Sequence, residues 1–299
     1  MNDSQLLEKR EFQPRYLIWA ILLHLIGFAI APFFFKAWTL SFSFLMAAVT
    51  AYSMGIFHHM YLSHQSFKSA TWLENLGVLL GTLTWRGPMA APLRYASMHR
   101  VHHRYSDKNK DPHSPQHGMF HALLGWNWYH TSFFQKPELY RRLAPEQFRH
   151  NKFFIFCDNN VNLLQFLYGA LLFLVGYLSS GLELAITLVL YGVFVKTLIV
   201  IYAANLVDLI NHTIGYRNYK TGDKSTNSFI MAILHLGGAI SWHNNHHARA
   251  KYFRVKTKWW EFDVHHMLLN FLSLFGAVED IKVLDETKTK QVATKVVEV

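Results

Sequence analysis

The chain has 299 residues, of which 51% are hydrophobic and only 16% are charged, and its formal net charge at neutral pH is +10. Soluble domains carry about 25% charged residues, so this composition argues against an ordinary soluble protein. The only cysteine, Cys157, excludes an internal disulfide and is compatible with a reducing compartment.

Four apolar stretches are long enough to cross a bilayer, which takes roughly 20 residues per helix. They cover about 16–35, 38–57, 161–178 and 185–206. We expect each consecutive pair to form a helical hairpin. The apolar segment from Trp72 to Trp85 is shorter and contains Glu74, so we expect an interfacial or re-entrant helix there.

The distribution of Lys and Arg predicts the orientation, because basic residues favour cytoplasmic loops. The two connections within the hairpins hold one and none of them, whereas 58–160 and the chain after 206 hold twelve each. We therefore predict a multi-pass protein of a bacterial inner membrane with both termini in the cytoplasm. It would form one domain (1–299), with a cytoplasmic helical cap from 58–160 and 207–284 and a polar tail at 285–299.

Nine histidines follow the apolar stretches in a regular pattern. One pair is five residues apart, two clusters have the form HxxHH, and one histidine stands alone. Histidines three and four apart share one helix face, so each HxxHH can aim two or three rings at one point. The pair at five needs a bent helix or an approach from different angles. The nine are His59, His64, His99, His102, His103, His212, His243, His246 and His247.

Neutral imidazole is a common ligand of iron, copper and zinc. Nine such ligands exceed what one ion can use, so the pattern predicts two metal ions. The expected architecture is an all-α integral membrane fold whose cytoplasmic cap holds this metal site above four transmembrane helices. The active site would therefore face the cytoplasm.

Further polar residues lie near the predicted site. Asn205, Asp208 and His212 are spaced three and four apart and share a face at the end of the fourth span. A carboxylate at a membrane boundary is costly unless it has a partner, so Asp208 is a candidate to support a metal or its water. The alternative is an aspartate solvated at the interface. Asn205 and His113 are candidates to surround the ligands.

Small residues form a stripe along the second span, at Ala47, Ala51 and Gly55, and the stripe leads to His59. It would leave room for the methyl end of an acyl chain. The alternative is close packing between helices, which is common for small residues in membranes.

Four arginines of the central segment are candidate contacts for a headgroup or a coenzyme A phosphate. The alternative is simple attraction of a cytoplasmic surface to anionic lipid. They are Arg86, Arg94, Arg100 and Arg104.

Together these motifs resemble the membrane-bound fatty acyl desaturases of the stearoyl-CoA type. The similarity covers about Tyr16 to Leu284 and includes Asp111-Pro112-His113, Gly125-Trp126 and the segment from Trp259 to Asp263. It implies a di-iron centre held by the nine histidines, with O2 as co-substrate. Its product would be a cis double bond, at the ninth carbon of a saturated chain carried by coenzyme A or a membrane lipid.

Two positions depart from that family's usual pattern: Asp208 stands where an asparagine is usual, and Leu123 stands where a histidine is common. The chain has no haem module, so the resemblance implies a separate electron donor, either a ferredoxin or a haem protein with its reductase. The bilayer is the other expected partner, and nucleic acid is not.

Two other functions use similar residues. A histidine-box hydroxylase of alkyl chains or lipids would have the same ligands and differ in retaining oxygen in its product. A metal transporter or sensor would place polar residues within several spans, whereas here the histidines gather on one side.

Overall fold

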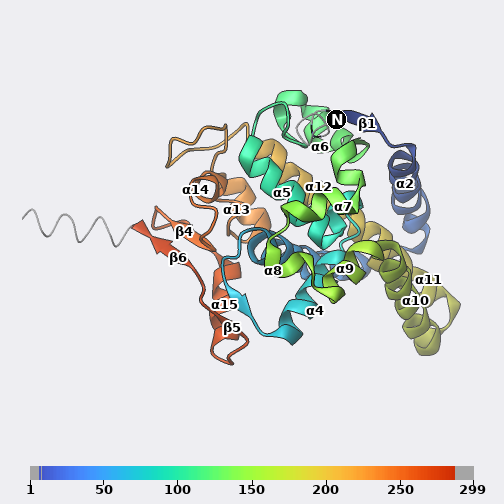
Figure 1. Ribbon diagram of the computed structural model, residues 1–299. Coiled ribbons are helices and arrows are strands. Elements are labelled where there is room, and N and C mark those ends of the chain that lie inside the picture. Colours follow the sequence, from blue (N-terminus) through green and yellow to red (C-terminus); the bar gives the residue numbers. More distant parts are fainter. Residues whose placement is uncertain (1–6, 8, 287–299) are drawn as a thin grey trace, which may run out of the picture.

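Figure 1 shows the computed structural model of the protein, which describes Leu7 and residues 9–286. Within that part of the chain, four apolar helices are long enough to cross a membrane: Pro14–Phe34, Thr39–Ser63, Val161–Ser180 and Leu182–Ile210. The prediction of four candidate spans is confirmed. The second and fourth helices run further than expected, so the second carries His59 and the fourth ends two residues before His212.

Three of these helices change their winding along their length. The first helix consists of α2 (Pro14–His24), the π-helix η1 (Leu25–Ile30) and the 3-10 helix η2 (Ala31–Phe34), and the second consists of α3 (Thr39–Ser53) and the π-helix η3 (Met54–Ser63). The third is the single α-helix α10 (Val161–Ser180). The fourth consists of α11 (Leu182–Val189), the π-helix η9 (Leu190–Val195) and α12 (Lys196–Ile210). Widened π turns are rare and often lie at functional sites.

The segment expected at the interface forms helix α4 (Thr71–Thr82), which packs along α3 and η3. Two glycines allow this close approach. A Cβ at Gly77 would lie 2.1 Å from an aromatic ring of η3, and a Cβ at Gly81 would lie 2.7 Å from the His58 ring. Helix α4 has 12 residues and is too short to span a bilayer. It braces the end of the second apolar helix.

Helix α5 (Pro92–Tyr105) lies in the middle of the molecule, against η3 and α9 (Lys152–Asn159) (Figure 1). The buried Asp158 carboxylate accepts hydrogen bonds from the backbone N–H groups of Leu93 and Arg94, at 3.0 and 3.1 Å. A carboxylate is favourable at this position because a helix N-terminus carries partial positive charge. The helix that bears the second histidine cluster is thus fixed at its start by another helix.

The remaining helices are short. They are the α-helices α6 (Met119–Leu123), α7 (Pro137–Tyr140), α8 (Glu146–Arg149), α13 (Phe229–His235), α14 (His243–Ala248) and α15 (Val264–Ser273), and the 3-10 helices η4 (Gly87–Ala90), η5 (Pro115–His117), η6 (Gly125–Asn127), η7 (Ser132–Gln135) and η8 (Arg141–Leu143). The largest hydrophobic core joins η3, α5, α9 and α15 through the fully buried Leu62, Leu93, Phe154 and Leu269.

The expected all-α fold also contains three two-stranded sheets, which the helical periodicity did not predict. Strands β1 (Arg10–Phe12) and β3 (Tyr129–Thr131) pair antiparallel, as do β2 (Lys68–Ser69) and β5 (Val278–Glu279), whereas β4 (Arg254–Lys256) and β6 (Val283–Asp285) are parallel. Each sheet joins segments distant in sequence. Asp285, expected to begin the polar tail, belongs to β6, and residues 287–299 of that tail lie outside the described part.

Helices α10 and α11 lie side by side and extend away from the rest of the molecule (Figure 1). Their closest approach is at Gly176, where an added Cβ would lie 2.6 Å from the Cα of Ala185. Gly169 stands two turns earlier in α10, and a Cβ there would meet only a Val193 methyl group at 3.6 Å. Backbone cannot move aside as a flexible side chain can, so Gly176 has no room for a larger residue.

We predict that Gly176→Ala lowers stability relative to Gly169→Ala by about 1–3 kcal/mol, the usual cost of overpacking. Both changes replace a helical glycine by alanine and share its gain in helix propensity, so their difference isolates the clash. Thermal unfolding of the purified proteins in one detergent would measure it. Equal stability of the two variants would contradict the packing.

Candidate metal centre

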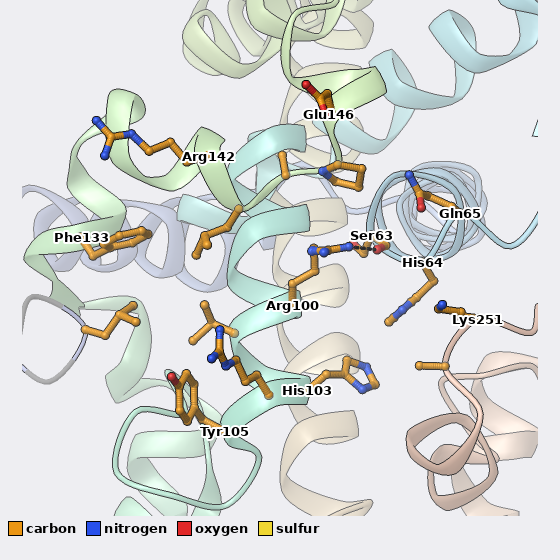
Figure 2. Close-up of a pocket in the computed structure, with 17 residues that line it drawn as sticks. Ser63, His64, Gln65, Arg100, His103, Tyr105, Phe133, Arg142, Glu146 and Lys251 are labelled. Atoms are coloured by element: carbon orange, nitrogen blue, oxygen red, sulfur yellow. Dashed lines mark hydrogen bonds between the residues drawn. The ribbon is translucent and has the colours of Figure 1, made fainter. Parts of the chain in front are cut away.

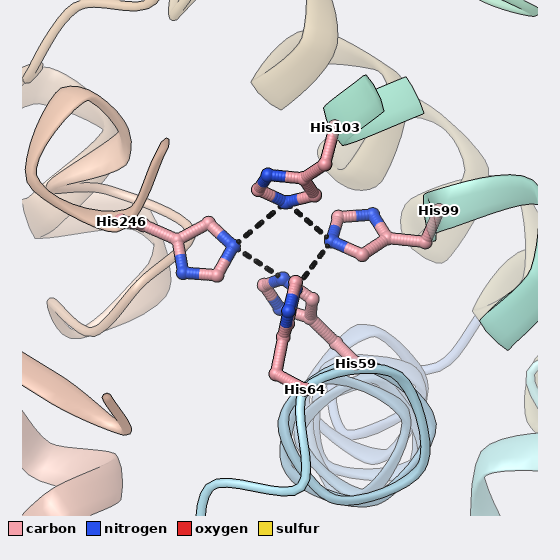
Figure 3. A group of neighbouring side chains, drawn as sticks. All are labelled: His59, His64, His99, His103 and His246. Carbon is pink, nitrogen blue, oxygen red and sulfur yellow. Dashed lines mark hydrogen bonds between the residues drawn. The ribbon is translucent and has the colours of Figure 1, made fainter. Parts of the chain in front are cut away.

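All nine histidines predicted as ligands converge on two neighbouring groups. Group one consists of His59, His64, His99, His103 and His246, and group two of His102, His212, His243 and His247. Within each group the candidate ligand atoms lie within 4.8 Å of one another. Figure 3 shows the five rings of group one directed at a common centre from three separate parts of the chain.

Each HxxHH cluster serves both groups. In α5, His99 and His103 belong to group one and His102 to group two. In α14 the assignment is reversed, because His243 and His247 belong to group two and His246 to group one. Residues four apart on a helix project together, while the residue between them projects to the side. Both helices therefore lie between the two groups and bridge them.

The widened winding of η3 explains how His59 and His64 meet. In an α-helix, five residues turn through about 500°, which would leave the two side chains about 140° apart. A π-helix closes its hydrogen bonds between residues five apart instead of four. The two rings lie 5.1 Å apart between centroids. Sequence analysis predicted either a bent helix or two rings that approach the site from different angles. In the structure, a change from α-helical to π-helical winding brings the two rings together.

The spacing of ring nitrogens suits ligands of a shared ion. In group one, the Nε2 atoms of His64 and His99 are 2.8 Å apart, and those of His99 and His103 are 2.9 Å apart. In group two, the Nε2 atom of His243 lies 3.1 Å from that of His212 and 3.0 Å from that of His247. Two nitrogens at right angles, each about 2.1 Å from one ion, would be separated by about 3.0 Å.

Hydrogen bonds alone do not satisfy this arrangement. The contacts of group one form a chain in which His99, His103 and His246 each have two nitrogen neighbours within 3.1 Å. A neutral ring nitrogen either carries one hydrogen or accepts one, so at most two of the four contacts in this chain can be hydrogen bonds. A cation at the centre would bind every lone pair. The residues present therefore fit a metal ion in each group.

Three aspartates orient the rings of group two. The Nδ1 atom of His102 donates to Asp111 at 3.0 Å, that of His212 to Asp107 at 2.9 Å, and that of His247 to Asp223 at 2.8 Å. Such bonds fix the tautomer, direct Nε2 to the metal and make the ligand more basic. Asp107 and Asp223 escaped the sequence analysis, and Asp111 was noted only as part of a motif. For Asp107 and Asp111, the sequence signal is their position within ten residues of the second histidine cluster.

Most of the rings are held neutral. Burial, followed by the neighbouring imidazoles, lowers the pKa of six of them well below the usual range: His64, His99, His103, His243, His246 and His247. Burial also opposes protonation of His102, but the Asp111 carboxylate raises its pKa to about 8. Neutral imidazole is the form that binds metals, and Asp111 favours positive charge at His102, whether a proton or a metal brings it.

Asp208 lies beside the two groups but not among their ligand atoms. One of its oxygens is 3.4 Å from the Arg86 guanidinium and the other is 3.8 Å from Nδ1 of His113. Arg86 also donates to the Asn205 side chain at 2.6 Å. The aspartate is thus partnered by charge, as expected near a membrane boundary. Asn205 and His113, predicted to surround the ligands, are both buried in this network.

A cavity of about 70 Å³ adjoins both groups on the side of the apolar helices. Ala51 and Gly55 line it together with His59, His99 and His243. Ala47, the third residue of the predicted stripe, is buried but does not line this cavity. Only the part of the stripe nearest the histidines therefore borders an open space.

The four arginines predicted to contact headgroups fall into two classes. Arg86 and Arg94 are buried, and Arg94 donates to the Tyr16 hydroxyl at 3.1 Å and to Nδ1 of His130 at 2.8 Å. Both have the internal hydrogen-bond partners that a buried guanidinium needs, and their contact with a headgroup stays a prediction. Arg100 and Arg104 are exposed.

Comparison with known proteins gives a consistent result. Residues 36–272 match the family model for fatty acid desaturases. The sn-1 stearoyl-lipid 9-desaturase of Synechocystis sp. is 33% identical over 268 residues, which cover 89% of this chain and 79% of that protein. Delta-9 acyl-lipid desaturase 2 of Arabidopsis thaliana is 30% identical over 264 residues, covering 88% of this chain and 81% of that protein.

The acyl-CoA C20 Delta5-desaturase of Anemone leveillei is 29% identical over 268 residues, covering 90% of this chain and 81% of that protein. The names of these relatives therefore differ in the acyl carrier and in the position of the double bond.

We predict that Asp223→Asn weakens metal binding at group two by roughly 10–100-fold, because the carboxylate no longer polarises His247. Group one should be unaffected, so one of two bound ions should become easier to remove. A chelator titration followed by elemental analysis would measure this. Asp280→Asn is a suitable control, since Asp280 is exposed and pairs with Lys68. Loss of both ions together, or of neither, would contradict the assignment.

Proposed function

The chain belongs to the fatty acid desaturase family and is an oxidoreductase that acts on acyl chains, and we propose that it places a cis double bond at the ninth carbon of a saturated chain carried by a membrane lipid. One observation carries this proposal. Two groups of imidazoles border a cavity that small and apolar residues of α3, η3 and α12 also line, together with the polar Arg86, His113 and Asp208.

The proposed acyl carrier and double-bond position rest on the names of similar proteins. Two that cover most of this chain are named stearoyl-lipid or acyl-lipid 9-desaturases. A third is named an acyl-CoA Delta5-desaturase, so a similar chain in another protein goes with another carrier and position. The alternative is an acyl chain carried by coenzyme A, and a product analysis must distinguish it from a lipid-linked chain.

A pair of irons bound by the nine histidines would supply the activation of O2 and the removal of two hydrogens from adjacent methylenes. The protein's part is to hold those methylenes beside the ligands and to exclude water. Val207 and Ile240 line the cavity together with Ala51 and Gly55. The Tyr95 ring stacks at 20° to the His99 ring, with centroids 5.8 Å apart, and borders the same cavity.

Asp208 would give this site a charge that an asparagine would not. Its carboxylate lines the cavity and is balanced by Arg86 at 3.4 Å. Since it lies outside the set of ligand atoms, we propose that it supports a water molecule at the site and not the metal directly.

We also propose the membrane arrangement. Lys36 lies between the first two apolar helices and Glu183 begins the fourth, and they form an ion pair at 2.6 Å. Both short connections thus lie at one end, and the histidine groups lie where the second and fourth helices finish. Two hairpins with the cap and both termini in the cytoplasm account for this arrangement and for the distribution of basic residues. Relatives in a bacterium support an inner-membrane location.

Expression in a host of known lipid composition would test the activity. We expect a new monounsaturated acyl chain with the bond at the ninth carbon, found in membrane lipid when lipid and acyl-CoA pools are analysed separately. Gas chromatography with mass spectrometry of derivatised double bonds gives the position. His102→Ala should yield no product, because group two loses a ligand that Asp111 orients.

Other products would point elsewhere. A hydroxylated chain, absent in His102→Ala, would replace the desaturase proposal by a hydroxylase. A new bond confined to the acyl-CoA pool would overturn the proposed carrier. No product from the wild-type protein, with two irons bound and its reductant supplied, would overturn the proposed activity.

The cavity predicts a limit on chain length. Ala51→Trp fills the space beside Gly55, so the accepted chain should become shorter and the product profile should move to shorter monoenes. Val49→Trp is the matched control, because Val49 is on the same helix but is 40% exposed on its outer side. If a folded, active Ala51→Trp protein gives the wild-type profile, the chain does not pass this residue.

A further inference from the structure

Two of the aspartates that orient group two lie in a segment with little regular structure. Residues 106–114, here called the aspartate loop, are all described and form neither helix nor strand between α5 and η5. Asp107 has a left-handed backbone, with φ at +60°, which is uncommon for a residue other than glycine. The Asp107 and Asp111 carboxylates nevertheless accept from Nδ1 of His212 and His102 at 2.9 and 3.0 Å. Contacts from other parts of the chain must therefore hold this loop.

Arg10 reaches the aspartate loop from strand β1. Its Nη2 group donates to the backbone carbonyls of Asn109 and Asp111 at 3.1 and 3.0 Å, and it lies 2.6 Å from Nε2 of His117. Burial, followed by the charge of Arg10, lowers the pKa of His117, so this ring is neutral and its Nε2 atom can accept. A planar guanidinium carries several donors in a fixed geometry. One side chain thus joins segments that are 101 residues apart in the chain.

The backbone around Arg10 is fixed independently of its side chain. Strand β1 pairs antiparallel with β3, and the Gln13 N–H donates to the Trp128 carbonyl at 2.8 Å, directly before the first apolar helix begins. On the other side of the strand, Leu7 is buried. It lines a hollow of about 760 Å³ together with Tyr105, the last residue of α5 (Figure 2). Replacement of the Arg10 side chain should therefore remove its contacts to the loop and leave the strand pairing in place.

We propose that Arg10 is a positioning residue of group two, whose guanidinium holds the aspartate loop so that Asp107 and Asp111 orient His212 and His102. This inference rests on the two-ion centre of the proposed function. The Asp107 N–H donates to the Asp111 carboxylate at 2.9 Å, so the two aspartates are coupled. Arg10 thus acts on two of the four candidate ligands of group two. In the described part of the chain, no aspartate of this loop bonds to a ring of group one.

Position and charge predict opposite effects of Arg10. A positive charge near Asp111 would reduce the negative potential behind His102, so removing the charge would strengthen the binding of a cation in group two. Removing a positioning contact lets the carboxylates move away from the rings, which weakens that binding. The geometry favours position, because the two donated bonds at 3.1 and 3.0 Å go to backbone carbonyls of the loop. The sign of the change in metal binding therefore separates the two effects.

The test follows the iron content of the full-length protein, loaded with two irons in detergent, during a chelator titration. Arg10→Gln removes the guanidinium, and Arg10→Lys keeps the charge without the planar fork. The matched control is Lys9→Gln, because the Lys9 side chain is exposed and pairs with Glu11 at 2.9 Å.

We expect Arg10→Gln to release one ion at about 3–10-fold lower chelator concentration, which is less than the effect of a residue that bonds to the ligand itself. The second ion should be retained as in wild type. Arg10→Lys should lie between Arg10→Gln and wild type, and Lys9→Gln should match wild type.

Two double variants identify the ion and the route. Asp223→Asn acts on group two through His247, so its fold-change and that of Arg10→Gln should multiply on one ion while the other ion stays bound. With Asp111→Asn, Arg10→Gln should have less than its own effect, because the carboxylate that it positions has lost its charge. Early release of both ions from the variant with Asp223→Asn would assign Arg10 to group one and overturn the inference.

Three results with the single variant would also overturn it. They are retention of both ions as in wild type, tighter retention of one ion, and equal weakening of both ions. The last result, together with a lower melting temperature of the metal-free Arg10→Gln protein, would assign Arg10 a general structural role. If Arg10→Gln does not fold, the same criteria apply to Arg10→Lys.

The iron content does not depend on turnover, so this inference and the proposed function can fail separately. If wild type forms no unsaturated product with its reductant supplied, but Arg10→Gln still releases one ion early, the proposed function fails and the positioning role stands. If wild type forms the expected monoene, but Arg10→Gln retains both ions as wild type does, the positioning role fails and the proposed function stands.

Discussion

Everything else in this structure depends on holding nine imidazoles within contact distance in a place from which water is excluded. Lone pairs at about 3 Å repel one another, and burial removes the solvent that would relieve them. Regular α-helices alone would not bring these rings together. The winding of η3 changes to bring His59 and His64 together, and Asp158 fixes the start of α5. A cation at the centre of each group would relieve this repulsion.

Helix α14 shows the same constraint in its backbone. Its six residues include three of the nine histidines, and a helix this short is not stable alone. The Asn227 side chain accepts from the backbone N–H groups of Asn244 and Asn245, at 2.9 and 3.2 Å. The Asn244 side chain in turn accepts from the N–H groups of Asn218 and Tyr219, both at 2.8 Å. Amide side chains thus replace the missing helical turns.

The two groups are chemically unequal. Group two has three aspartates on its outer nitrogens, whereas among the described residues no carboxylate bonds to a ring nitrogen of group one. Group one instead has Arg100 nearby, which donates to the Ser63 carbonyl at 3.3 Å. Negative charge behind a ligand increases its basicity and favours a more highly charged metal. An ion in group two would therefore hold positive charge more readily than one in group one.

The sequence was informative where a residue pattern has one physical meaning. Apolar length predicted the four helices, and the repeated HxxHH predicted that the histidines converge. The sequence did not predict hydrogen bonds between residues that are distant in the chain. Asp223 meets His247 from a loop 24 residues away, and no periodicity marks such a pair. The π-helical winding of η3 also has no sequence signature comparable to a cap or a glycine, so only the five-residue spacing indicated that an α-helix would fail.

The partners of Lys196 are a second example of contacts that the sequence does not predict. Lys196 lies within the predicted fourth span and is fully buried at the start of α12. Its ammonium donates to the Leu83 carbonyl at the end of α4 and lies 5.5 Å from the centre of the Tyr168 ring. A charge inside an apolar helix must find such partners. Which carbonyl it finds depends on how α4 packs, which sequence spacing does not reveal.

The division of the imidazoles by environment gives the site two sides. Three of them line a cavity together with small and apolar residues of the apolar helices, and three line two hollows that are also lined by exposed Lys and Arg side chains. These surroundings act on different groups, since an apolar group is stabilised by the exclusion of water, whereas basic side chains attract negative charge over a long range. Because each HxxHH helix lies between the two groups and contributes to both, the same two helices separate these surroundings. The repeated spacing of the clusters thus contributes six of the nine candidate ligands and also gives the site two different faces.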